Sequence, residues 1–347
     1  MTGKLRTVIG SASSIHAVER LKADPVLELI YEPDLYPPQR FPSDMEGDPE
    51  FQRTTEQQVR YEKLLTSAEV LFGIPDSRPS LLRKIVPLNP GLRWVHTMAA
   101  GGGGQVRMAK LTDNDLARIV FTTSAGAHAL TLAEYAVFGV LCGAKGLPKI
   151  QALQKEQVWA NRWVPKHIHE MTICIVAMGE IGRLTADYFL HMGAKVIGVN
   201  RSVREVPGVE MHGVEELVAC AARSDAIINC LPGAIGTEKL ISAEVLAAAP
   251  EGVIVVSLGR GNCIDEEALF AELRSGHIGY AALDVVAQEP LAVDSPLWNL
   301  PNVLITPHTM ALAAREEDRI VDIFLANAHA LVAGQPLRHL MNKELFY

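Results

Sequence analysis

The sequence predicts an α/β protein of two domains, each organised around a parallel sheet. From Thr172 to Thr306, apolar runs typical of strands alternate regularly with helical stretches, which indicates a parallel sheet covered by helices on both faces. A second, shorter set of strand-like runs lies in the first hundred residues. With 347 residues and 48% hydrophobic content, the chain is long and apolar enough to bury two cores.

The composition favours a soluble protein. A net charge of -8 argues against nucleic-acid or membrane-surface partners, since both require a basic face. The N-terminal run 7–10 is too short for the apolar core of a signal peptide, and no apolar stretch is long enough to span a bilayer. Five cysteines occur singly, without the CxxC spacing of a metal or redox site. We therefore expect a cytoplasmic protein without a bound metal.

The first domain is expected to be a small α/β unit. Its strand-like and helical runs are Val26–Tyr31, Glu56–Thr66, Val70–Gly73 and Arg93–Thr97. The segment 35–49, rich in proline and acidic residues, is expected to be a loop that need not be ordered. Four glycines follow Ala99 and Ala100. A flexible turn and a backbone that passes close to a ligand both need this lack of side chains.

Two helices are expected outside the regular alternation. The segment Ala129–Gly143 is apolar nearly all round, with one acid at Glu134, so it must be buried between domains or between subunits. A symmetric homodimer would cover such a surface. Polar and aromatic residues 144–171 follow as connecting helix and loop, and the amphipathic stretch Ala311–Leu331 is expected to return to the first domain.

A glycine turn between a strand and a helix predicts a dinucleotide site. Residues 177–182 read Ala-Met-Gly-Glu-Ile-Gly, between the strand Thr172–Val176 and a helical run. Gly179 and Gly182 allow a pyrophosphate to approach the helix N-terminus. Ala177 replaces the first glycine of the usual pattern and asks for a slightly different turn. A purely structural turn is the alternative, which the flanking strand and helix disfavour.

The end of the next strand indicates which nucleotide binds. The strand Ala194–Val199 is followed by Asn-Arg-Ser-Val-Arg at positions 200–204. NAD binding normally places an acid there for the ribose hydroxyls, whereas a 2′-phosphate favours arginine and small hydroxyl donors. A solvated basic loop is the alternative interpretation. We expect NADP(H) to be preferred, with NAD(H) possible.

Three further residues predict the chemistry. Arg260, Glu289 and His308 each follow a strand-like run, and such residues converge at the carboxyl edge of a parallel sheet. A guanidinium matches a carboxylate bidentately, and an imidazole held by a carboxylate is oriented to give and take a proton. Most histidines are structural, and no functional role is expected for His96, His128, His169 and His212.

Several ordered motifs together resemble the D-isomer-specific 2-hydroxyacid dehydrogenases, most closely the glyoxylate/hydroxypyruvate reductase type. The resemblance covers most of the chain from Trp94 to His308. It rests on Ala129–Tyr135, the glycine turn, Asn229–Pro232 with Thr237, Gly259–Gly261 with Asp265, Ala268 and Leu269, Leu283–Val285 with Glu289 and Pro290, and Thr306–His308.

The resemblance implies a doubly wound, Rossmann-like NAD(P)-binding domain (127–309) inserted into a flavodoxin-like substrate-binding domain (1–126 and 310–347). It implies that Arg260 orients the substrate carboxylate, that His308 donates the proton and that Glu289 tunes the histidine. Substrate-binding residues would be Ala100, Gly101, Arg260 and His308. Cofactor-binding residues would be Gly179, Glu180, Ile181, Gly182, Arg201, Ser202, Arg204, Cys230, Leu231, Pro232, Thr237, Leu258, Gly259 and Asp284, the last at the nicotinamide end.

The expected function is the NAD(P)H-dependent reduction of a small 2-oxo acid to the D-2-hydroxy acid. The chain departs from its relatives at 99–103, where Ala-Ala-Gly-Gly-Gly replaces Ser-Ala-Gly-Val-Asp, and at Glu180, where many relatives carry arginine. Two alternatives stay open. One is a corepressor-like binding protein that keeps this fold. The other is a dehydrogenase for a bulkier 2-oxo acid or for phosphite.

Overall fold

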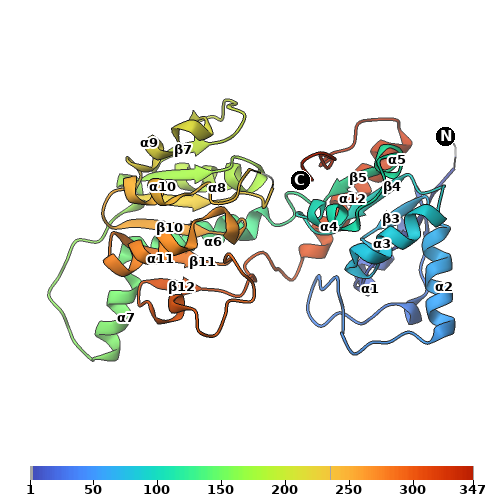
Figure 1. Ribbon diagram of the computed structural model, residues 1–347, viewed down its shortest axis with the longest axis horizontal. Coiled ribbons are helices and arrows are strands. Elements are labelled where there is room, and N and C mark those ends of the chain that lie inside the picture. Colours follow the sequence, from blue (N-terminus) through green and yellow to red (C-terminus); the bar gives the residue numbers. More distant parts are fainter. Residues whose placement is uncertain (1–2, 235, 347) are drawn as a thin grey trace. The chain divides into compact units, whose positions relative to one another are not determined.

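The computed structural model describes residues 3–234 and 236–346, and it confirms the predicted fold class of two α/β domains with parallel sheets. The chain divides into unit 1, Met1–His128 with Leu312–Tyr347, and unit 2, Ala129–Ala311. The chain crosses between the units two residues later than the expected boundaries at 126/127 and 309/310. Each unit contains its own sheet (Figure 1).

Unit 1 contains a five-stranded parallel sheet in the order β2-β1-β3-β4-β5, which is the flavodoxin-like order. Its elements are β1 (Leu5–Ile9), α1 (Ile15–Ala23), β2 (Leu27–Ile30), η1 (Pro33–Leu35), α2 (Thr55–Thr66), β3 (Val70–Phe72), η2 (Pro75–Ser77), α3 (Pro79–Ile85), η3 (Val86–Leu88), β4 (Trp94–Thr97), α4 (Gly103–Ala109), α5 (Asp113–Arg118), β5 (Val120–Thr123) and α12 (Glu316–Val332).

The C-terminal part of the chain completes unit 1. Helix α12 begins at Glu316, five residues later than the expected start at 311, and its buried Phe324 stacks on Trp94 of β4 with ring centroids 4.7 Å apart. Beyond the helix, the backbone amide of Met341 donates to the carbonyl of Phe121, so the tail lies along β5. Both chain ends therefore contribute to one core.

The loop before α2 is more organised than its composition suggests. The buried carboxylate of Asp44 accepts hydrogen bonds from the guanidinium of Arg40 and from the backbone amide of Gly47. The Arg40 guanidinium contributes most to lowering the pKa of Asp44 to about 2. The carbonyl of Met45 accepts from the backbone amide of Ala12, which fastens the loop to the end of β1. One internal carboxylate thus orders a segment that sequence alone marks only as a loop.

Unit 2 contains a seven-stranded parallel sheet in the order β12-β11-β10-β9-β6-β7-β8, the doubly wound Rossmann-like order with one added strand. Its elements are α6 (Ala129–Lys145), α7 (Leu147–Lys155), η4 (Ile168–Glu170), β6 (Thr172–Val176), α8 (Glu180–His191), β7 (Lys195–Val199), β8 (Val209–His212), η5 (Val214–Glu216), α9 (Leu217–Ala221), β9 (Ala226–Asn229), α10 (Ala243–Ala248), β10 (Val253–Ser257), η6 (Gly261–Cys263), α11 (Glu266–Ser275), β11 (Ile278–Leu283), η7 (Pro296–Asn299) and β12 (Val303–Ile305).

In the single chain, helix α6 is buried on one side and exposed on the other, and the expected burial of the exposed side between domains or between subunits stays a prediction. Its inner side packs on its own sheet so closely that a Cβ at Gly139 would lie 2.9 Å from that of Ala282. On its outer side Leu130, Glu134 and Phe138 are exposed. Small residues on the inner side, such as Ala136 and Gly139, permit this close packing.

Among residues 3–234 and 236–346, no single helix has the length and hydropathy needed to cross a membrane. The bent pair formed by α6 and α7 would pass this test by length and composition only.

Candidate active site

Arg260, Glu289 and His308 follow three neighbouring strands at one edge of the seven-stranded sheet. The strands β10, β11 and β12 are adjacent and parallel, so the loops that leave them share the carboxyl edge. His308 and Glu289 are in direct contact. Within the described part of the chain, no hydrogen bond or ion pair joins Arg260 to either of them.

The imidazole of His308 is held at one nitrogen and open at the other. Its Nδ1 lies 2.6 Å from Oε2 of Glu289, and a carboxylate at that distance requires Nδ1 to carry the proton. The two side chains are 42% and 36% exposed. No described residue bonds Nε2, which leaves this nitrogen available to exchange a proton with a bound molecule.

A buried carboxylate positions the backbone around His308. Asp284 is 2% exposed, and its oxygens accept from the hydroxyl of Thr306 at 2.7 Å and the amides of Thr309 and Met310 at 3.0 and 3.2 Å. The amide of His308 donates to the Asp284 carbonyl at 3.0 Å. These bonds stabilise the left-handed backbone of His308, φ +51°, which is unfavourable for a residue with a side chain.

The expected contact of Asp284 with the nicotinamide stays a prediction. In the protein itself, both carboxylate oxygens of Asp284 accept hydrogen bonds from residues 306–310, and the side chain is 2% exposed. These bonds order the backbone around His308.

Tyr135 of α6 extends this network, and sequence reasoning did not single it out. Its hydroxyl lies 3.2 Å from Oγ1 of Thr306. Because the Thr306 proton goes to the carboxylate of Asp284, Tyr135 must be the donor to Thr306. Burial raises the pKa of Tyr135 to about 12, so the phenol keeps its proton. The available signal was a tyrosine in an apolar helix, since a buried hydroxyl needs a partner.

Arg260 is exposed, and among the described residues its guanidinium makes one hydrogen bond, from Nη1 to the carbonyl of its neighbour Gly259 at 2.8 Å. The flanking glycines are required by close backbone contacts. A Cβ at Gly259 would lie 2.4 Å from the carbonyl oxygen of Leu231, and one at Gly261 would lie 2.0 Å from the backbone of Val286. The loops after β9, β10 and β11 thus pack directly on one another and fix the origin of the guanidinium.

Asn229, at the end of β9, also anchors this region. It is fully buried, donates from Nδ2 to the carbonyl of Arg260 at 3.0 Å, and accepts from the amide of Leu231 at 3.0 Å. Sequence reasoning used Asn229 only as part of a motif. Its two bonds tie together the loops that carry the predicted cofactor and substrate residues.

The glycine turn after β6 fits a pyrophosphate. A Cβ at Gly182 would lie 2.2 Å from the carbonyl oxygen of Ala177, whereas a Cβ at Gly179 would meet nothing within 4 Å. Gly179 begins α8 without a side-chain cap, which leaves the first amides of the helix open. Glu180 is exposed. Ala177 adopts the left-handed backbone of glycine, φ +82°, so the turn is kept despite the substitution.

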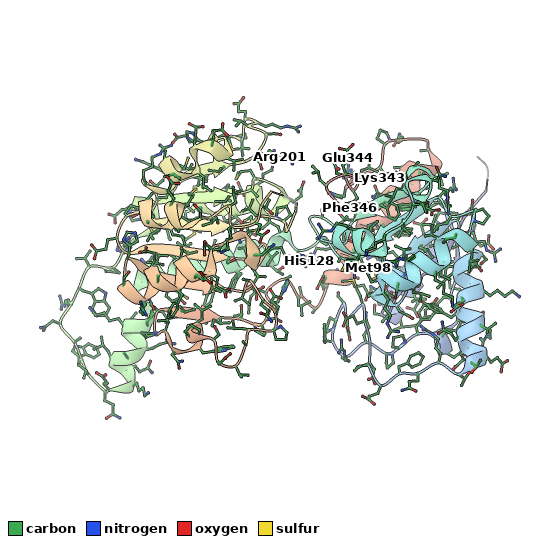
Figure 2. All side chains as sticks on the ribbon, in the orientation of Figure 1. Met98, His128, Arg201, Lys343, Glu344 and Phe346 are labelled. Atoms are coloured by element: carbon green, nitrogen blue, oxygen red, sulfur yellow. The ribbon has the colours of Figure 1, made fainter. Side chains whose placement is uncertain are left out.

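The loop after β7 presents the residues predicted to select the nucleotide. Arg201, Ser202 and Arg204 are all exposed, and Arg201 is labelled in Figure 2. The side-chain amide of Asn200 donates to the carbonyl of Ser202 at 3.1 Å and shapes the start of the loop. An anionic group at this position would meet two guanidinium groups and one hydroxyl.

The remaining predicted cofactor residues lie beside the glycine turn. The amide of Cys230 donates to the carbonyl of Val176, so the ends of β9 and β6 adjoin at the point where the strand order reverses. Leu231 and Leu258 are buried, whereas Pro232 is exposed. Burial raises the pKa of Cys230 to about 12, which rules out a thiolate nucleophile there.

Thr237 holds its own loop together. Its hydroxyl donates to the carbonyl of Pro232 and accepts from the amide of Ala234, so it shapes the loop rather than offering a free donor. Together, the open helix start, the exposed arginines and these loops fit a dinucleotide phosphate. No group of three or more His, Cys, Asp or Glu able to hold a metal occurs among the described residues.

Ala100 and Gly101 lie in unit 1, in the turn after β4, while Arg260, Glu289 and His308 belong to unit 2. No described residue accepts a hydrogen bond from either amide. A Cβ at Gly102 would lie 2.0 Å from Oγ1 of Thr97, whereas one at Gly104 would meet nothing. Within the glycine run, Gly102 is therefore required by packing and Gly104 is not.

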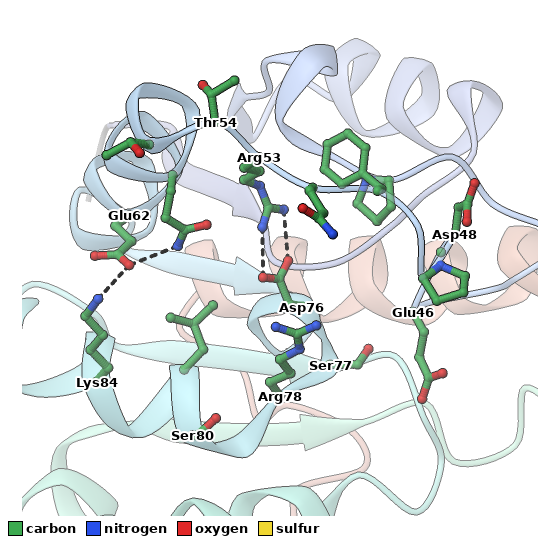
Figure 3. A pocket seen from close by; sticks show the side chains of 18 of the residues that line it. Glu46, Asp48, Arg53, Thr54, Glu62, Asp76, Ser77, Arg78, Ser80 and Lys84 are labelled. Carbon is green, nitrogen blue, oxygen red and sulfur yellow. Dashed lines mark hydrogen bonds and ion pairs between the residues drawn. The ribbon is translucent and has the colours of Figure 1, made fainter.

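Unit 1 also has an open groove of about 1320 Å³ between the loop before α2, the start of α2 and the segment 76–84 (Figure 3). No predicted site residue lines it. Its Arg53, 8% exposed, forms a bidentate ion pair with Asp76 at 2.9 Å. Four cationic side chains in the wall are matched by four carboxylates, so the groove has no net charge to attract an anion.

Comparisons with known proteins agree with this geometry. A family model described as "D-isomer specific 2-hydroxyacid dehydrogenase, NAD binding domain" matches residues 137–310. Glyoxylate/hydroxypyruvate reductase A of Salmonella dublin is 31% identical over 297 residues, which cover 82% of this chain and 94% of that protein.

Solved structures give the same result. A D-isomer specific 2-hydroxyacid dehydrogenase from Xanthobacter autotrophicus, in complex with NADPH and MES, has a TM-score of 0.79 and 26% identity, covering 99% of this chain and 100% of that one. An NADPH-dependent glyoxylate/hydroxypyruvate reductase from Sinorhizobium meliloti, in complex with NADP and sulfate, has a TM-score of 0.78 and 25% identity with the same coverage. The chain therefore belongs to the D-isomer specific 2-hydroxyacid dehydrogenases, a family of NAD(P)-dependent oxidoreductases.

Proposed function

We propose that this protein reduces a small 2-oxo acid of the glyoxylate or hydroxypyruvate type to the D-2-hydroxy acid, with NADPH as the preferred cofactor and NADH as a possible one. The observation that carries the proposal is the pair of His308 and Glu289, in which Nε2 of His308 bonds no described residue. Arg260, in the loop after the neighbouring strand β10, is exposed, and its guanidinium donates to the carbonyl of Gly259. These groups supply proton transfer and carboxylate recognition, which are the two needs of 2-oxo acid reduction. The named relatives support the substrate class.

In this mechanism Arg260 binds the substrate carboxylate through its planar fork. When bound, the cofactor supplies a hydride to the carbonyl carbon. His308 gives the Nε2 proton to the carbonyl oxygen, which completes the hydroxyl group and leaves a neutral imidazole that takes a new proton from water. Glu289 keeps Nδ1 protonated and the ring oriented throughout.

Arg260 also stabilises the charge that develops on the carbonyl oxygen, because a guanidinium in place before the reaction needs no reorganisation. Asp284, Thr306 and Tyr135 contribute indirectly, since they hold the backbone on which His308 is mounted.

Nucleotide binding would use the first turn of α8 at Gly179–Gly182 for the pyrophosphate and the loop after β7 for a 2′-phosphate. NADP-bound relatives support this choice. Residues 230–232, Thr237, Leu258 and Gly259 would line the remaining length of the nucleotide.

We further propose a homodimer formed through the outer side of α6. Leu130 and Phe138 are exposed there, and Trp159 and Val164 are exposed in the segment that follows α7. A two-fold contact would cover such a surface on both copies at once. Light scattering of the wild type should give twice the mass of one chain. A Phe138→Glu variant should give the mass of a single chain. A wild-type monomer would remove this proposal.

The function is tested by initial rates of NADPH and NADH oxidation with glyoxylate, hydroxypyruvate and larger 2-oxo acids. Phosphite is tested separately, as a reductant of NADP+ and NAD+. We expect turnover of the small 2-oxo acids, preference for NADPH, and a product of D configuration on chiral chromatography. Nucleotide binding without turnover of any substrate would contradict the proposal and favour a binding protein of the corepressor type.

A further inference from the structure

A second cluster of imidazole, carboxylate and guanidinium groups lies at the end of β8, away from Arg260 and His308. His212 has a carboxylate at each ring nitrogen, with Nε2 2.9 Å from Oε1 of Glu210 and Nδ1 3.1 Å from Oε1 of Glu216. Arg223 donates to both oxygens of Glu210, at 2.6 and 3.1 Å. The mechanism uses none of these residues.

The surroundings of His212 favour its charged form. Hydrogen bonds to Glu210 and then to Glu216 raise its pKa, because both carboxylates need a donor. The side chain is 19% exposed, so solvent screens these contacts only partly. Nη2 of Arg223 also lies 2.9 Å from Nε2 of His212, where it can donate if the ring is neutral. The ring therefore has partners in both protonation states and can titrate without leaving its place.

The cluster adjoins the loop that carries the predicted 2′-phosphate residues. The amide of Asn200 donates to the carbonyl of His212 at 3.1 Å, and Val199 is the register partner of His212. At its other end the loop returns to β8 through a bridge between Val206 and Val209. The segment 200–206, with Arg201, Ser202 and Arg204, thus begins and ends on the strand that bears the cluster.

We propose that the cluster of Glu210, His212, Glu216 and Arg223 is a cofactor-specificity element, in which the two cationic groups neutralise two carboxylates that would otherwise repel the 2′-phosphate of NADPH. This inference rests on the proposed use of NADPH. Loss of the His212 proton is expected to weaken NADPH and to leave NADH, which has no 2′-phosphate, unaffected.

The charges on the described groups support this role. Glu210 and Glu216 carry two negative charges, and Arg223 and protonated His212 carry two positive ones. Deprotonation of His212 leaves one net negative charge beside the loop. The nearby thiol of Cys220 stays neutral because burial raises its pKa. The loop itself carries Arg201, Arg204 and the carboxylate of Glu205, and the change of charge proposed here is that of His212.

The expected effect is modest, because partly exposed charges interact weakly in water. A single charge at this exposure should change the NADPH dissociation constant roughly three- to fivefold. The sign follows from the raised pKa of His212: the proton, and with it the tighter binding of NADPH, is lost as the pH rises through that pKa. The 2′-phosphate itself is almost fully ionised above about pH 7, so its own titration does not mask the effect.

The test measures the dissociation constants of NADPH and NADH by cofactor fluorescence from about pH 7 to pH 9.5. For the wild type, the ratio Kd(NADH)/Kd(NADPH) should fall roughly three- to fivefold with rising pH. A His212→Asn variant should show the low ratio already at about pH 7 and no further change. Removing one carboxylate as well, in His212→Asn with Glu216→Gln, should restore the ratio at neutral pH.

The matched control is His191→Asn, which alters another histidine–carboxylate pair at the far end of α8 and should leave the wild-type profile. A wild-type ratio that stays constant with pH, or a His212→Asn variant that weakens NADH as much as NADPH, would overturn the inference. Neither of these outcomes would contradict the proposed reduction of 2-oxo acids. If neither nucleotide binds, the proposed function fails together with the inference.

Discussion

Two regions of unit 2 place an imidazole against carboxylates, and they differ in how many ring nitrogens are hydrogen-bonded. His308 uses Nδ1 for Glu289 at 2.6 Å, and no described residue bonds its Nε2. His212 uses both nitrogens, for Glu210 and Glu216. Only the first ring can pass a proton to a bound molecule without breaking a contact. The second can act through its charge alone.

The two arginines differ in the same way. Among the described residues, the guanidinium of Arg260 makes one hydrogen bond, to the carbonyl of Gly259, while that of Arg223 donates to both oxygens of Glu210. A guanidinium already paired with a carboxylate has little left to offer a substrate. Residue type alone therefore does not assign a role to a side chain in this sheet. The role depends on which hydrogen-bond donors and acceptors have no partner among the described residues.

The largest effect expected among the tests of this comparison comes from removing the free guanidinium. An Arg260→Ala variant should lose about 10²- to 10³-fold in kcat/KM for the 2-oxo acid, because both carboxylate binding and stabilisation of the developing charge are lost. Steady-state kinetics at saturating NADPH measures this. The control is Arg274→Ala, an exposed arginine on the last turn of α11. An Arg260→Ala variant with nearly full kcat/KM would sink the role of Arg260.

A smaller effect is expected from the buried carboxylate behind His308. An Asp284→Asn variant places an amide nitrogen where backbone amides now donate, so it should lower kcat about 10²-fold and the free energy of unfolding by about 2 kcal/mol. Urea unfolding and turnover are measured on the same preparation. Asp225→Asn is the control, because Asp225 accepts the amide of Thr172 at the opposite edge of the sheet. It should lose stability alone, and equal kcat losses in the two variants would contradict positioning by Asp284.

The smallest effect is expected at Tyr135. A Tyr135→Phe variant removes the donor to Thr306 and should lower kcat roughly threefold, with KM for the 2-oxo acid unchanged. The control is Tyr188→Phe on α8, whose hydroxyl bonds no described residue. If Tyr135→Phe changes KM and leaves kcat intact, the hydroxyl acts on substrate binding and not on the His308 segment.

The sequence predicts much of this fold and site, because the parallel sheet and the loops at strand ends follow from local patterns, while the arrangement of the two domains follows from the family resemblance. The glycine turn and the placement of Arg260, Glu289 and His308 after successive strands need only the alternation of apolar runs and the geometry of a parallel sheet.

What the sequence does not show depends on backbone conformation. The hydrogen bonds of Asp284 to residues 306–310 depend on the left-handed backbone of His308, which no local sequence pattern predicts. The contacts of His212 have a readable signal, since Glu210 and Glu216 stand two residues before and four after it. Arg223 joins this cluster only through the fold.

The most direct test of the account is a His308→Asn variant, assayed for turnover of hydroxypyruvate with NADPH and for NADPH binding on the same preparation. The account predicts that kcat falls about 10³-fold while the NADPH dissociation constant changes by less than about twofold, since the proton donor is lost and the nucleotide site is untouched. A variant that keeps kcat within about tenfold of the wild type would show that another group donates the proton, and the central claim would be wrong.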